Sequence, residues 1–324
     1  MKIAVIDDYQ DAFRKLAVFS RLKGHEVVVF HDTEKDPAKL AARVNGADVV
    51  ILTQQRSPIP RAVVDKLTGV KLLAQTGRNT GHIDVAACTE KGIAVAAAGG
   101  GTSYSTAELA WGLIIASLRH IPHEVEKLKQ GVWQTTVGTG LRGKSLGVYA
   151  LGKIGGSVAQ VGKAFGMNVT CWGREASQAK AREAGYEVPA SREAFFAGAD
   201  VISLHIPLSK ETRGIVTAAD LAHMKPTALL VNTSRAPLIQ EGALLAALKQ
   251  GRPGFAAVDV YENEPVVGGN HPLLKMANVI CTPHLGYVEQ GTYENYYGTV
   301  IDSILGFASG KPVNVLNPEA LGSK

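Results

Sequence analysis

The chain has 324 residues, which is long for one hydrophobic core and suits two domains of ordinary size. Its formal net charge is +5, yet no run of Lys or Arg forms a basic tail and aromatic residues make up only 6%. We therefore expect small anionic ligands and no nucleic-acid surface. Cys88, Cys171 and Cys281 are far apart without a C-x-x-C pair, and no apolar stretch reaches the length of a membrane span. Because the short apolar N-terminal run is also unlike a signal peptide, we expect a cytoplasmic protein with no metal site and no membrane segment.

Residues 1–98 alternate short apolar runs with helical patterns. The runs are rich in Val, Ile and Ala and predict strands at residues 3–6, 27–30, 49–52, 72–75 and 93–97. The helical patterns between them each end on a glycine, which relieves the left-handed backbone conformation just past a helix: Gly24, Gly46, Gly69 and Gly92. Strands that alternate with helices predict a parallel sheet with helices on both faces.

Consecutive glycines at residues 99–101 indicate a hinge between domains. A long helical pattern follows from residue 103 to residue 130, with a bend expected at Pro122. Its apolar residues occur on almost every side of the helix: Leu109, Trp111, Leu113, Ile114 and Leu118. Because one domain alone would not cover so many apolar faces, we expect the helix to be buried between domains or subunits and predict a homodimer.

Residues 144–174, KSLGVYALGKIGGSVAQVGKAFGMNVTCWGR, have the pattern of a strand, a tight turn, a helix and a second strand. A strand that enters a helix through glycines gathers unpaired backbone N–H groups and the positive end of the helix dipole, which suits a pyrophosphate. The glycine pattern is incomplete, because Ala150 occupies the first position and Gly152 and Gly155 occupy the second and third. A packing turn without a ligand is the alternative, and a dinucleotide site is favoured.

Further strands of this second sheet are expected at residues 201–204, 228–231, 256–260 and 279–281. The last helical pattern, residues 288–309, ends at Gly310, and we expect it to return to the first domain. The predicted fold class is α/β with two doubly wound parallel sheets. One domain would be discontinuous, with residues 1–98 and 288–324, and the other would contain residues 99–287.

Polar residues follow each strand of the second sheet, where open parallel sheets bind their ligands. They combine an imidazole, a guanidinium and carboxylates: His205, Pro207, Asn232, Thr233, Ser234, Arg235, Asp259, Glu262, Glu264, Thr282 and His284. Each of them taken alone is more often a structural or surface residue. Their joint occurrence at one sheet edge makes Arg235, Glu264 and His284 a candidate catalytic set.

The chain resembles the D-isomer-specific 2-hydroxyacid dehydrogenase family over essentially its whole length. Four blocks carry the resemblance: LGKIG at 151–155, VNTSRAPLI at 231–239, VDVYENEP at 258–265 and TPHLGY at 282–287. It implies a flavodoxin-like substrate domain, a Rossmann NAD(P)-binding domain and an enzyme that interconverts a D-2-hydroxy acid and its 2-oxo acid. It also implies that Arg235, Glu264 and His284 are catalytic, and it too points to a homodimer.

The resemblance also implies positions for both ligands. The dinucleotide would contact the glycine turn and the neighbouring strand ends: Thr106, Leu151, Gly152, Lys153, Ile154, Gly155, Gly173, Arg174, His205, Pro207, Thr212, Thr233, Ser234, Asp259 and Gly286. Asp259 would hold the nicotinamide carboxamide. The substrate carboxylate would contact Arg235 and a first-domain loop: Gly77, Arg78, Asn79 and Thr80. Arg56 and Arg78 could contact a second anionic group, although the sequence alone favours ordinary surface cations at both positions.

The residue types suggest how the reaction would run. Reduction of a 2-oxo acid needs a hydride donor, a proton donor and an anchor for the carboxylate. The nicotinamide would give the hydride, and His284 as imidazolium would give the proton, with Glu264 favouring its charged form. Arg235 would bind the carboxylate and polarise the carbonyl.

The chain departs from the family pattern at several positions. Tyr287 and Val288 replace the small residues common after the histidine, and Asn79 stands where the family often has glycine. The acidic residue at the end of the second strand is absent, with Gly173 and Arg174 in its place. Glycine leaves room for a 2′-phosphate and a guanidinium can pair with it, so the sequence favours NADP(H) over NAD(H).

Several alternatives stay open from the sequence. Glu175 could take the ribose hydroxyl after a small backbone shift, which would favour NAD(H). The acid can be glyoxylate, hydroxypyruvate, a bulkier 2-oxo acid or a 3-phosphoglycerate-type substrate. A dinucleotide-sensing regulatory or corepressor module on the same fold, or a formate- or phosphonate-type dehydrogenase, is the alternative function.

Overall fold

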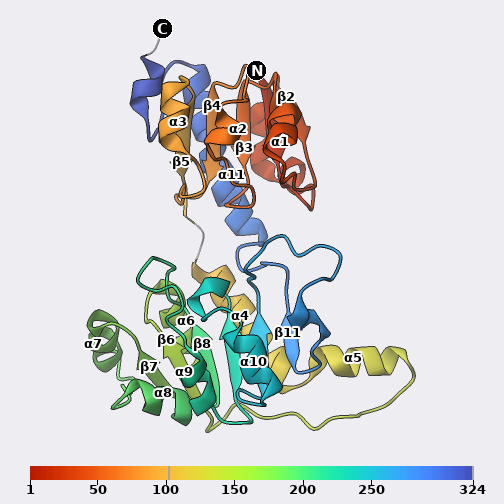
Figure 1. Ribbon diagram of the computed structural model, residues 1–324, viewed down its shortest axis with the longest axis vertical. Helices are drawn as coiled ribbons and strands as arrows, with labels where there is room; N and C mark the ends of the chain where they lie inside the picture. Colours follow the sequence, from red (N-terminus) through yellow and green to blue (C-terminus); the bar gives the residue numbers. More distant parts are fainter. Residues whose placement is uncertain (101–102, 323–324) are drawn as a thin grey trace. The chain divides into compact units, whose positions relative to one another are not determined.

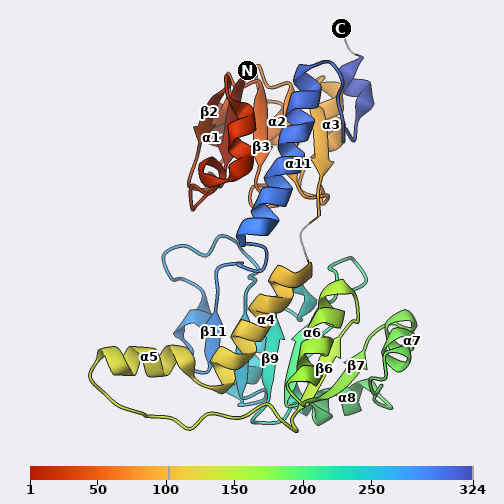
Figure 2. The ribbon, with the colours of Figure 1, turned by 180° about the vertical axis from the view of Figure 1, so that it is seen from behind.

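The computed structural model describes residues 1–100 and 103–322, so the last glycine of the expected hinge lies outside the described residues. The chain divides into two compact units, Met1–Gly101 with Val288–Lys324 and Thr102–Tyr287. Figures 1 and 2 show the elements of each unit from two sides. Within the described ranges, no helix combines the length and the hydropathy that crossing a membrane requires.

The first unit contains a parallel sheet with the strand order β2-β1-β3-β4-β5, which is the flavodoxin-like order. Its strands are β1 (Lys2–Ile6), β2 (Glu26–Val29), β3 (Val49–Leu52), β4 (Leu72–Thr76) and β5 (Ala94–Ala98). All pairings are parallel. The strands are short and apolar on both faces because helices cover both sides of the sheet, which confirms the fold class predicted from these runs.

Helices cover the two faces of this sheet. One face packs against α1 (Pro37–Val44), α2 (Arg61–Val64) and α3 (Val85–Glu90), and α11 (Gln290–Ala308) lies on the opposite face (Figures 1 and 2). The predicted helix between the first two strands is instead a pair of 3-10 helices, η1 (Phe13–Lys15) and η2 (Ala17–Leu22). The Asp8 carboxylate accepts hydrogen bonds from the amides of Ala12 and Phe13, and the extended backbone of Leu16 interrupts the turn. The C-terminal segment ends in η5 (Pro318–Leu321).

The second unit contains a six-stranded parallel sheet with the order β11-β10-β9-β8-β6-β7. Its strands are β6 (Ser145–Tyr149), β7 (Asn168–Trp172), β8 (Val201–Leu204), β9 (Leu229–Asn232), β10 (Phe255–Val258) and β11 (Val279–Cys281). A parallel bridge between Thr170 and Glu187 adds a one-residue strand beyond β7. With this bridge, the order matches that of a Rossmann sheet.

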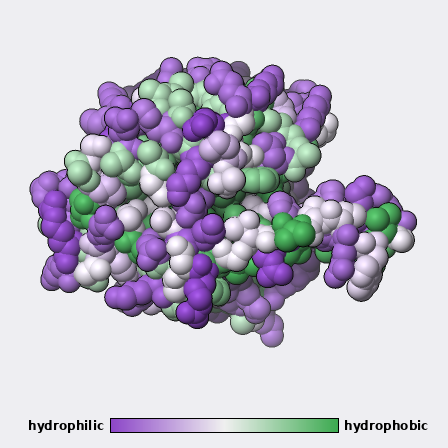
Figure 3. Space-filling view, turned by 90° about the horizontal axis from the view of Figure 1, so that it is seen from below, coloured by the Kyte–Doolittle hydropathy of each residue, from purple (hydrophilic) through white to green (hydrophobic). Residues whose placement is uncertain are grey.

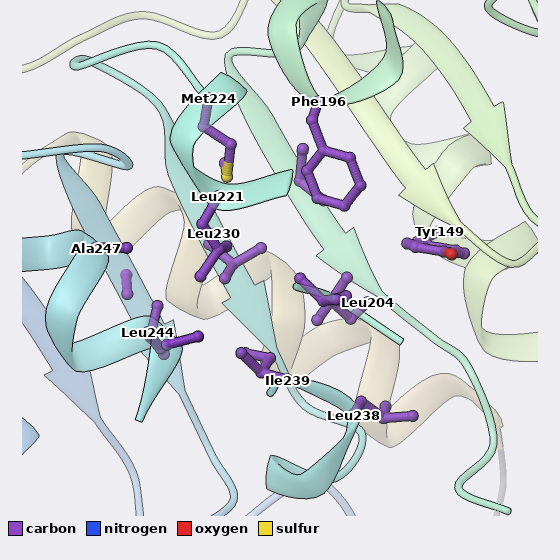
Figure 4. Packing of buried hydrophobic residues seen from close by; sticks show 14 of the residues in the cluster. Tyr149, Phe196, Leu204, Leu221, Met224, Leu230, Leu238, Ile239, Leu244 and Ala247 are labelled. Atoms are coloured by element: carbon purple, nitrogen blue, oxygen red, sulfur yellow. The ribbon is translucent and has the colours of Figure 1, made fainter. Parts of the chain in front are cut away.

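Two helical layers bury this sheet. One face packs against α4 (Ser103–Leu118) and α6 (Lys153–Ala164), and the other packs against α8 (Arg192–Gly198), α9 (Ala218–His223) and α10 (Ala243–Lys249). Figure 4 shows the second layer, in which Leu204 and Leu230 of the sheet lie among side chains from the helices. The helix α7 (Glu175–Glu183) follows β7. Of two short 3-10 helices, η3 (Ala236–Leu238) follows β9 and η4 (Pro272–Lys275) precedes β11.

The long helix predicted over residues 103–130 is wrong in two respects. The structure has two helices, α4 and α5 (Ile121–Lys129), because His120 between them adopts a left-handed backbone conformation with φ of 52°. Pro122 lies in the first turn of α5, where its missing N–H costs nothing. The apolar residues of α4 are buried inside the second unit: Trp111, Leu113, Ile114 and Leu118. One unit therefore does cover this helix.

Exposed apolar side chains follow α4 in the segment of residues 121–140, which we term the arm. The arm consists of α5, which buries no residue, followed by a stretch in which residues 132–140 form neither helix nor strand. Figures 1 and 2 show it extending away from the rest of the second unit, and Figure 3 shows apolar patches on its surface. Its exposed apolar side chains are Ile121, Val125, Leu128, Val132, Trp133 and Val137.

Candidate active site

The glycine turn connects β6 to α6. Ala150, at the first position of the pattern, has a φ of 76°, a left-handed conformation that alanine adopts at a cost. A Cβ atom on Gly155 would lie 2.2 Å from the carbonyl oxygen of Ala150, so helix and strand approach too closely for any side chain there. A Cβ atom on Gly152 would meet nothing within 4 Å. The third glycine thus serves packing, and the second leaves open space over the backbone.

The N-terminus of α6 presents unpaired donors to this space. Gly152 is the N-cap residue and no side chain caps the helix. Among the described residues, no acceptor bonds the amides of Gly152, Lys153, Ile154 or Gly155, and the first helical bond runs from the Gly156 amide to the Gly152 carbonyl. Unpaired amides at the positive end of a helix of 12 residues can bind a phosphate group.

Two further polar groups at the same sheet edge have no partner in the part of the chain that the structure describes. They are the buried Nδ1 of His205, after β8, and the buried hydroxyl of Thr233, after β9. The other imidazole nitrogen of His205 lies 2.9 Å from the Ser203 hydroxyl, and burial lowers the pKa of His205 to about 4. A neutral imidazole and a hydroxyl with unused hydrogen-bonding capacity can pair with a polar ligand. These groups and the glycine turn fit a dinucleotide.

Other residues predicted to bind the dinucleotide use their polar groups within the protein. The Thr212 hydroxyl donates to the carbonyl oxygen of Pro207 at 2.7 Å, and the Ser234 hydroxyl donates to the carbonyl oxygen of Leu204 at 2.7 Å. These bonds fix the loops that follow β8 and β9. Direct contacts of Thr212 and Ser234 with a cofactor remain predictions.

The end of β7 carries the residues expected to distinguish NAD(H) from NADP(H). Arg174 is exposed and occupies the N-cap position of α7. Glu175 forms an ion pair with Arg182 at 3.0 Å. Glu211, on the loop after β8, has a lowered pKa, chiefly because the Ser209 hydroxyl bonds it and in smaller part because of the charge of Arg174. The carboxylate of Glu175 is thus engaged on its own helix, and Arg174 lies within electrostatic range of Glu211.

Asp259 organises the loop that carries His284. Its Oδ1 accepts bonds from the Thr282 hydroxyl at 2.6 Å and from the Leu285 amide at 2.7 Å, and its Oδ2 accepts from the Gly286 amide at 2.8 Å. Asp259 is fully buried, and burial raises its pKa despite these bonds. The predicted contact of Asp259 with the nicotinamide carboxamide remains a prediction, because the structure shows only its bonds to this loop. Thr106 adds a bond from α4, since its hydroxyl donates to the Gly286 carbonyl oxygen at 2.8 Å.

His284 and Glu264 form an imidazole–carboxylate pair in the second unit. The Nδ1 of His284 lies 2.6 Å from Oε2 of Glu264, and the Tyr261 amide donates to Oε1 at 2.9 Å. Burial raises the pKa of Glu264, but the hydrogen bond and charge of His284, with the charge of Arg235, outweigh burial and hold it below its usual value. His284 itself has a φ of 54°, and its amide donates to the Thr282 carbonyl oxygen. With Nδ1 occupied by Glu264, Nε2 is the nitrogen left to exchange a proton with a substrate.

Arg235 is half-buried at the end of β9. Its Nη1 donates to the carbonyl oxygen of Ser234 at 2.7 Å, and its backbone carbonyl oxygen accepts a hydrogen bond from the side-chain amide of Asn232 at 3.0 Å. Its charge contributes to the lowered pKa of Glu264, so the guanidinium lies within electrostatic range of the pair. The second unit therefore gathers Arg235, Glu264 and His284 at one region of its sheet edge. A guanidinium beside an imidazole–carboxylate pair can bind a carboxylate and transfer a proton next to it.

The loop expected to bind a substrate carboxylate follows β4 in the first unit. The Gly77 amide donates to the Ala98 carbonyl oxygen, but the amides of Arg78, Asn79 and Thr80 have no acceptor within residues 1–100 and 103–322. Arg78 is exposed and forms no ion pair with any described residue. Successive unpaired amides beside a cation can bind an anion.

Arg56 lies at the end of β3, in the same unit as this loop. Its Nη1 donates to the Asp7 carbonyl oxygen, its Nη2 donates to the Tyr293 hydroxyl at 3.2 Å, and its guanidinium lies 4.5 Å from the ring centroid of Tyr9. The buried Asp7, whose pKa burial raises, adds a negative charge near it. These contacts make Arg56 a positioned side chain, in contrast to the surface cation that the sequence alone allowed.

One residue near the site was not predicted to act there. The ring of Tyr287 contacts the imidazole of His284, with centroids 5.3 Å apart. The sequence signalled it only through the presence of a bulky residue where the resembled family commonly has small ones. No group of three or more His, Cys, Asp or Glu side chains suited to a metal occurs in the described part of the chain.

Comparisons with known proteins identify the family of the chain. Residues 111–286 match the family model described as "D-isomer specific 2-hydroxyacid dehydrogenase, NAD binding domain". The chain is 40% identical to a D-3-phosphoglycerate dehydrogenase of Methanocaldococcus jannaschii over 76% of this chain and 47% of that protein, so it spans about half the length of that relative. It is 33% identical to a glyoxylate reductase of Aeropyrum pernix over 92% of both chains.

A solved oxidoreductase structure from Ralstonia solanacearum is similar to the whole molecule. It is 48% identical in sequence, has a TM-score of 0.94, and the match covers 99% of this chain and 98% of that chain. Both units thus have counterparts in one known structure. On these grounds the chain belongs to the D-isomer-specific 2-hydroxyacid dehydrogenase family.

Proposed function

We propose that the protein is an NAD(P)-dependent oxidoreductase that interconverts a D-2-hydroxy acid and its 2-oxo acid. The observation that carries the proposal is the 2.6 Å pair of His284 and Glu264, with the charge of Arg235 in range. The unpaired amides of the glycine turn lie at the same edge of the sheet. Family membership supports the reaction class.

In this proposal His284 transfers the proton. In reduction, Nε2 of the imidazolium donates its proton to the oxygen of the substrate carbonyl, and in oxidation the neutral Nε2 accepts the proton of the hydroxyl group. Glu264, bonded to Nδ1, fixes the ring and stabilises its positive charge. Arg235 holds the carboxylate of the acid and draws electron density from the neighbouring carbonyl.

The cofactor would bind at the glycine turn of the second unit. Its pyrophosphate would accept hydrogen bonds from the unpaired amides of Gly152 to Gly155, and His205 and Thr233 would bond its polar groups with their unpartnered atoms. The nicotinamide, when bound, supplies the hydride of the reaction. We propose NADP(H) as the preferred form, because the exposed Arg174 takes the place of the acidic residue that would repel a 2′-phosphate.

The substrate proposal extends to the loop after β4. The unpaired amides of Arg78, Asn79 and Thr80 would bind the carboxylate, and Arg56 and Arg78 would favour acids with a second anionic group. Relatives with closely similar sequences bear the names D-3-phosphoglycerate dehydrogenase and glyoxylate reductase, so both a phosphorylated and a small acid belong in the test.

The experiment is a substrate panel at the nicotinamide absorbance. Glyoxylate, hydroxypyruvate, a bulkier 2-oxo acid and a phosphorylated 3-carbon 2-oxo acid are each supplied with NADH or NADPH. Turnover of one or more acids supports the proposal, and a chiral hydroxy product should be the D-isomer. Binding of the dinucleotide without turnover of any acid would contradict it and favour a regulatory module. Formate and phosphonate are tested in parallel with NAD⁺ or NADP⁺, and oxidation of one of these alone would favour a formate- or phosphonate-type dehydrogenase.

We further propose that two copies of the chain associate through the arm. Within the second unit, nothing covers the exposed apolar side chains of α5 and of residues 132–140. The side chain of Glu124 accepts hydrogen bonds from both Thr135 and Thr136, which holds the outgoing stretch of the arm against α5. An ordered, projecting and apolar arm suits a self-complementary contact between identical chains.

A further inference from the structure

Tyr287 makes an aromatic contact with His284. Its ring centroid lies 5.3 Å from that of the imidazole and the two planes meet at 71°, an edge-to-face arrangement. Tyr287 is half-buried and is the last residue of the second unit. The contact therefore joins a side chain with no part in the proposed reaction to the residue that would transfer the proton.

The backbone between the two residues is held in place. The Gly286 amide donates to Asp259 Oδ2 and its carbonyl oxygen accepts from the Thr106 hydroxyl, each at 2.8 Å. The Leu285 amide donates to the other oxygen of Asp259. A Cβ atom on Gly286 would already come within 3.3 Å of the Asp259 carboxylate. Because buried groups fix these peptide units, the ring of Tyr287 starts from a defined position relative to His284.

A single hydrogen bond does not fix an imidazole plane. The hydrogen bond that Nδ1 donates to Glu264 sets one point of the ring, but the ring can still tilt about that bond and about its own Cβ–Cγ axis. A bulky ring packed edge-to-face against the imidazole limits this tilt. The direction of Nε2 depends on the tilt, and general acid catalysis depends on the direction of Nε2 toward the substrate oxygen.

We propose that Tyr287 is a positioning residue for His284 and that its ring, rather than its hydroxyl group, holds the imidazole plane. The proposal rests on the proposed function, because it assigns to His284 the transfer of the proton. It places Tyr287 beside Glu264 as a second constraint on the same ring. The ring stays out of the chemistry and acts only through His284.

Three variants of Tyr287 test the proposal. Tyr287→Phe keeps the ring, Tyr287→Leu keeps most of the bulk without an aromatic ring, and Tyr287→Ala removes both. Tyr186→Leu is the matched control, since Tyr186 packs against the core of the same unit. We expect the Leu and Ala variants at Tyr287 to lower kcat about three- to tenfold, with the substrate KM and the dinucleotide Kd within about twofold of the parent. Tyr287→Phe and Tyr186→Leu should retain the parental kcat.

A measurement without substrate separates this proposal from the proposed function. The ¹⁵N resonances of the His284 imidazole, recorded on the intact chain, report its tautomer and its hydrogen bond to Glu264. We expect the Phe variant to retain the parental signals, and the Leu and Ala variants to broaden or shift them, even if no substrate has been found. Parental resonances and parental kcat in Tyr287→Ala would overturn the proposal. So would an equal loss in Tyr287→Phe, which would assign the effect to the hydroxyl group.

Discussion

The Nδ1 atom of His284 lies 2.6 Å from Oε2 of Glu264, while the other carboxylate oxygen of Glu264 accepts the Tyr261 amide at 2.9 Å. Both oxygens of the carboxylate therefore accept a hydrogen bond, and among the described residues the imidazole has a hydrogen-bond partner on Nδ1 alone. This asymmetry makes Nε2 the nitrogen that we propose exchanges the proton. It also makes the effects of changing the two residues different in kind.

Replacement of His284 by alanine should remove most of the turnover and leave cofactor binding intact. In the proposed mechanism the imidazole acts on the substrate oxygen, whereas the proposed dinucleotide contacts lie on the glycine turn and on the loops after β7, β8 and β9. General acid–base groups commonly contribute about 10²–10⁴-fold to rate. The check is kcat for the best 2-oxo acid together with the dinucleotide Kd from protein fluorescence. A His284→Ala variant with a kcat close to the parental value would refute the assignment.

Replacement of Glu264 by glutamine should move the pH profile of reduction. The carboxylate is ionised over the working range because its pKa is held below its usual value, with the hydrogen bond from His284 as the main lowering cause opposing burial. Its negative charge would stabilise the imidazolium that donates the proton, so loss of the charge should make reduction fail at a lower pH than in the parent. The measurement is kcat against pH in the reducing direction. An unshifted alkaline limb would show that Glu264 does not stabilise the charged ring.

The sequence predicted the sheets well because their signal is local. The strand runs are short, apolar and bounded by polar or glycine residues, and the glycines after the helices do adopt positive φ, as at Gly46 with 82° and Gly69 with 80°. The prediction of one long helix over residues 103–130 was wrong because helix propensity gave no sign of the left-handed backbone conformation at His120. A helix that is apolar on many sides can be covered by the layers of a single unit, as α4 is.

The site was predictable in its residue types but not in its internal bonds. Strand-end position and family resemblance identified Arg235, Glu264 and His284. They did not reveal that Asp259 bonds the 282–286 loop, nor that Tyr287 packs on His284, because both depend on side-chain directions in a loop without regular structure. Ala150 shows the same limit: the sequence gives only an alanine at the first glycine position, and the structure shows it in a left-handed conformation that favours glycine.

The stability of the protein should fall as the pH drops from about 6.5 to about 4, in part through His82. Burial lowers the pKa of His82 from 6.5 to about 4, and neither imidazole nitrogen has a hydrogen-bond partner among the described residues. The folded state thus prefers the neutral ring. The stability that the neutral ring contributes is complete above the pKa of the unfolded state and is lost as the pH falls toward the pKa of the folded state. The loss should be on the order of 2–3 kcal/mol at pH 4.

The test for His82 compares the free energy of unfolding against pH for the parent and for His82→Leu. The leucine variant cannot bind a proton and should show a smaller decrease over this range. The exposed His223, changed to glutamine, is the control and should follow the parental curve. A His82→Leu curve parallel to that of the parent would contradict the expectation. His205, whose pKa burial also lowers to about 4, should account for part of the remaining decrease.

The proposed dimer should dissociate when the arm becomes polar. The double change Leu128→Ser and Trp133→Ser removes two apolar side chains that are 57% and 74% exposed in one chain. Light scattering should give about twice the 34.2 kDa of one chain for the parent and one chain mass for the variant. Val267→Ser is the control, because Val267 is 70% exposed but lies outside the arm. A parental mass near 34.2 kDa at micromolar concentration would show that the arm does not join two copies.

The choice of cofactor should depend on Arg174. The residue is exposed at the N-cap of α7. The nearest acidic residue in sequence, Glu175, is paired with Arg182 and forms no hydrogen bond with Gly173 in the described part of the chain. A guanidinium in this place can pair with a 2′-phosphate, whereas the ribose hydroxyl of NAD(H) offers it no charge. We therefore expect the parent to have a higher kcat/KM with NADPH than with NADH.

Arg174→Ala should weaken NADPH far more than NADH, by an amount on the order of a charge-assisted hydrogen bond, about 1.5–3 kcal/mol in kcat/KM. Lys180→Ala, which removes another cation of α7, is the matched control and should affect both cofactors equally. Glu211 lies within electrostatic range of Arg174, so Glu211→Gln should raise the preference for NADPH by removing a negative charge near Arg174. Arg174→Ala can instead reduce kcat/KM equally for the two cofactors, or the parent can prefer NADH. Either result would show that Arg174 does not bind the 2′-phosphate and that another residue of the loop replaces the missing acidic residue.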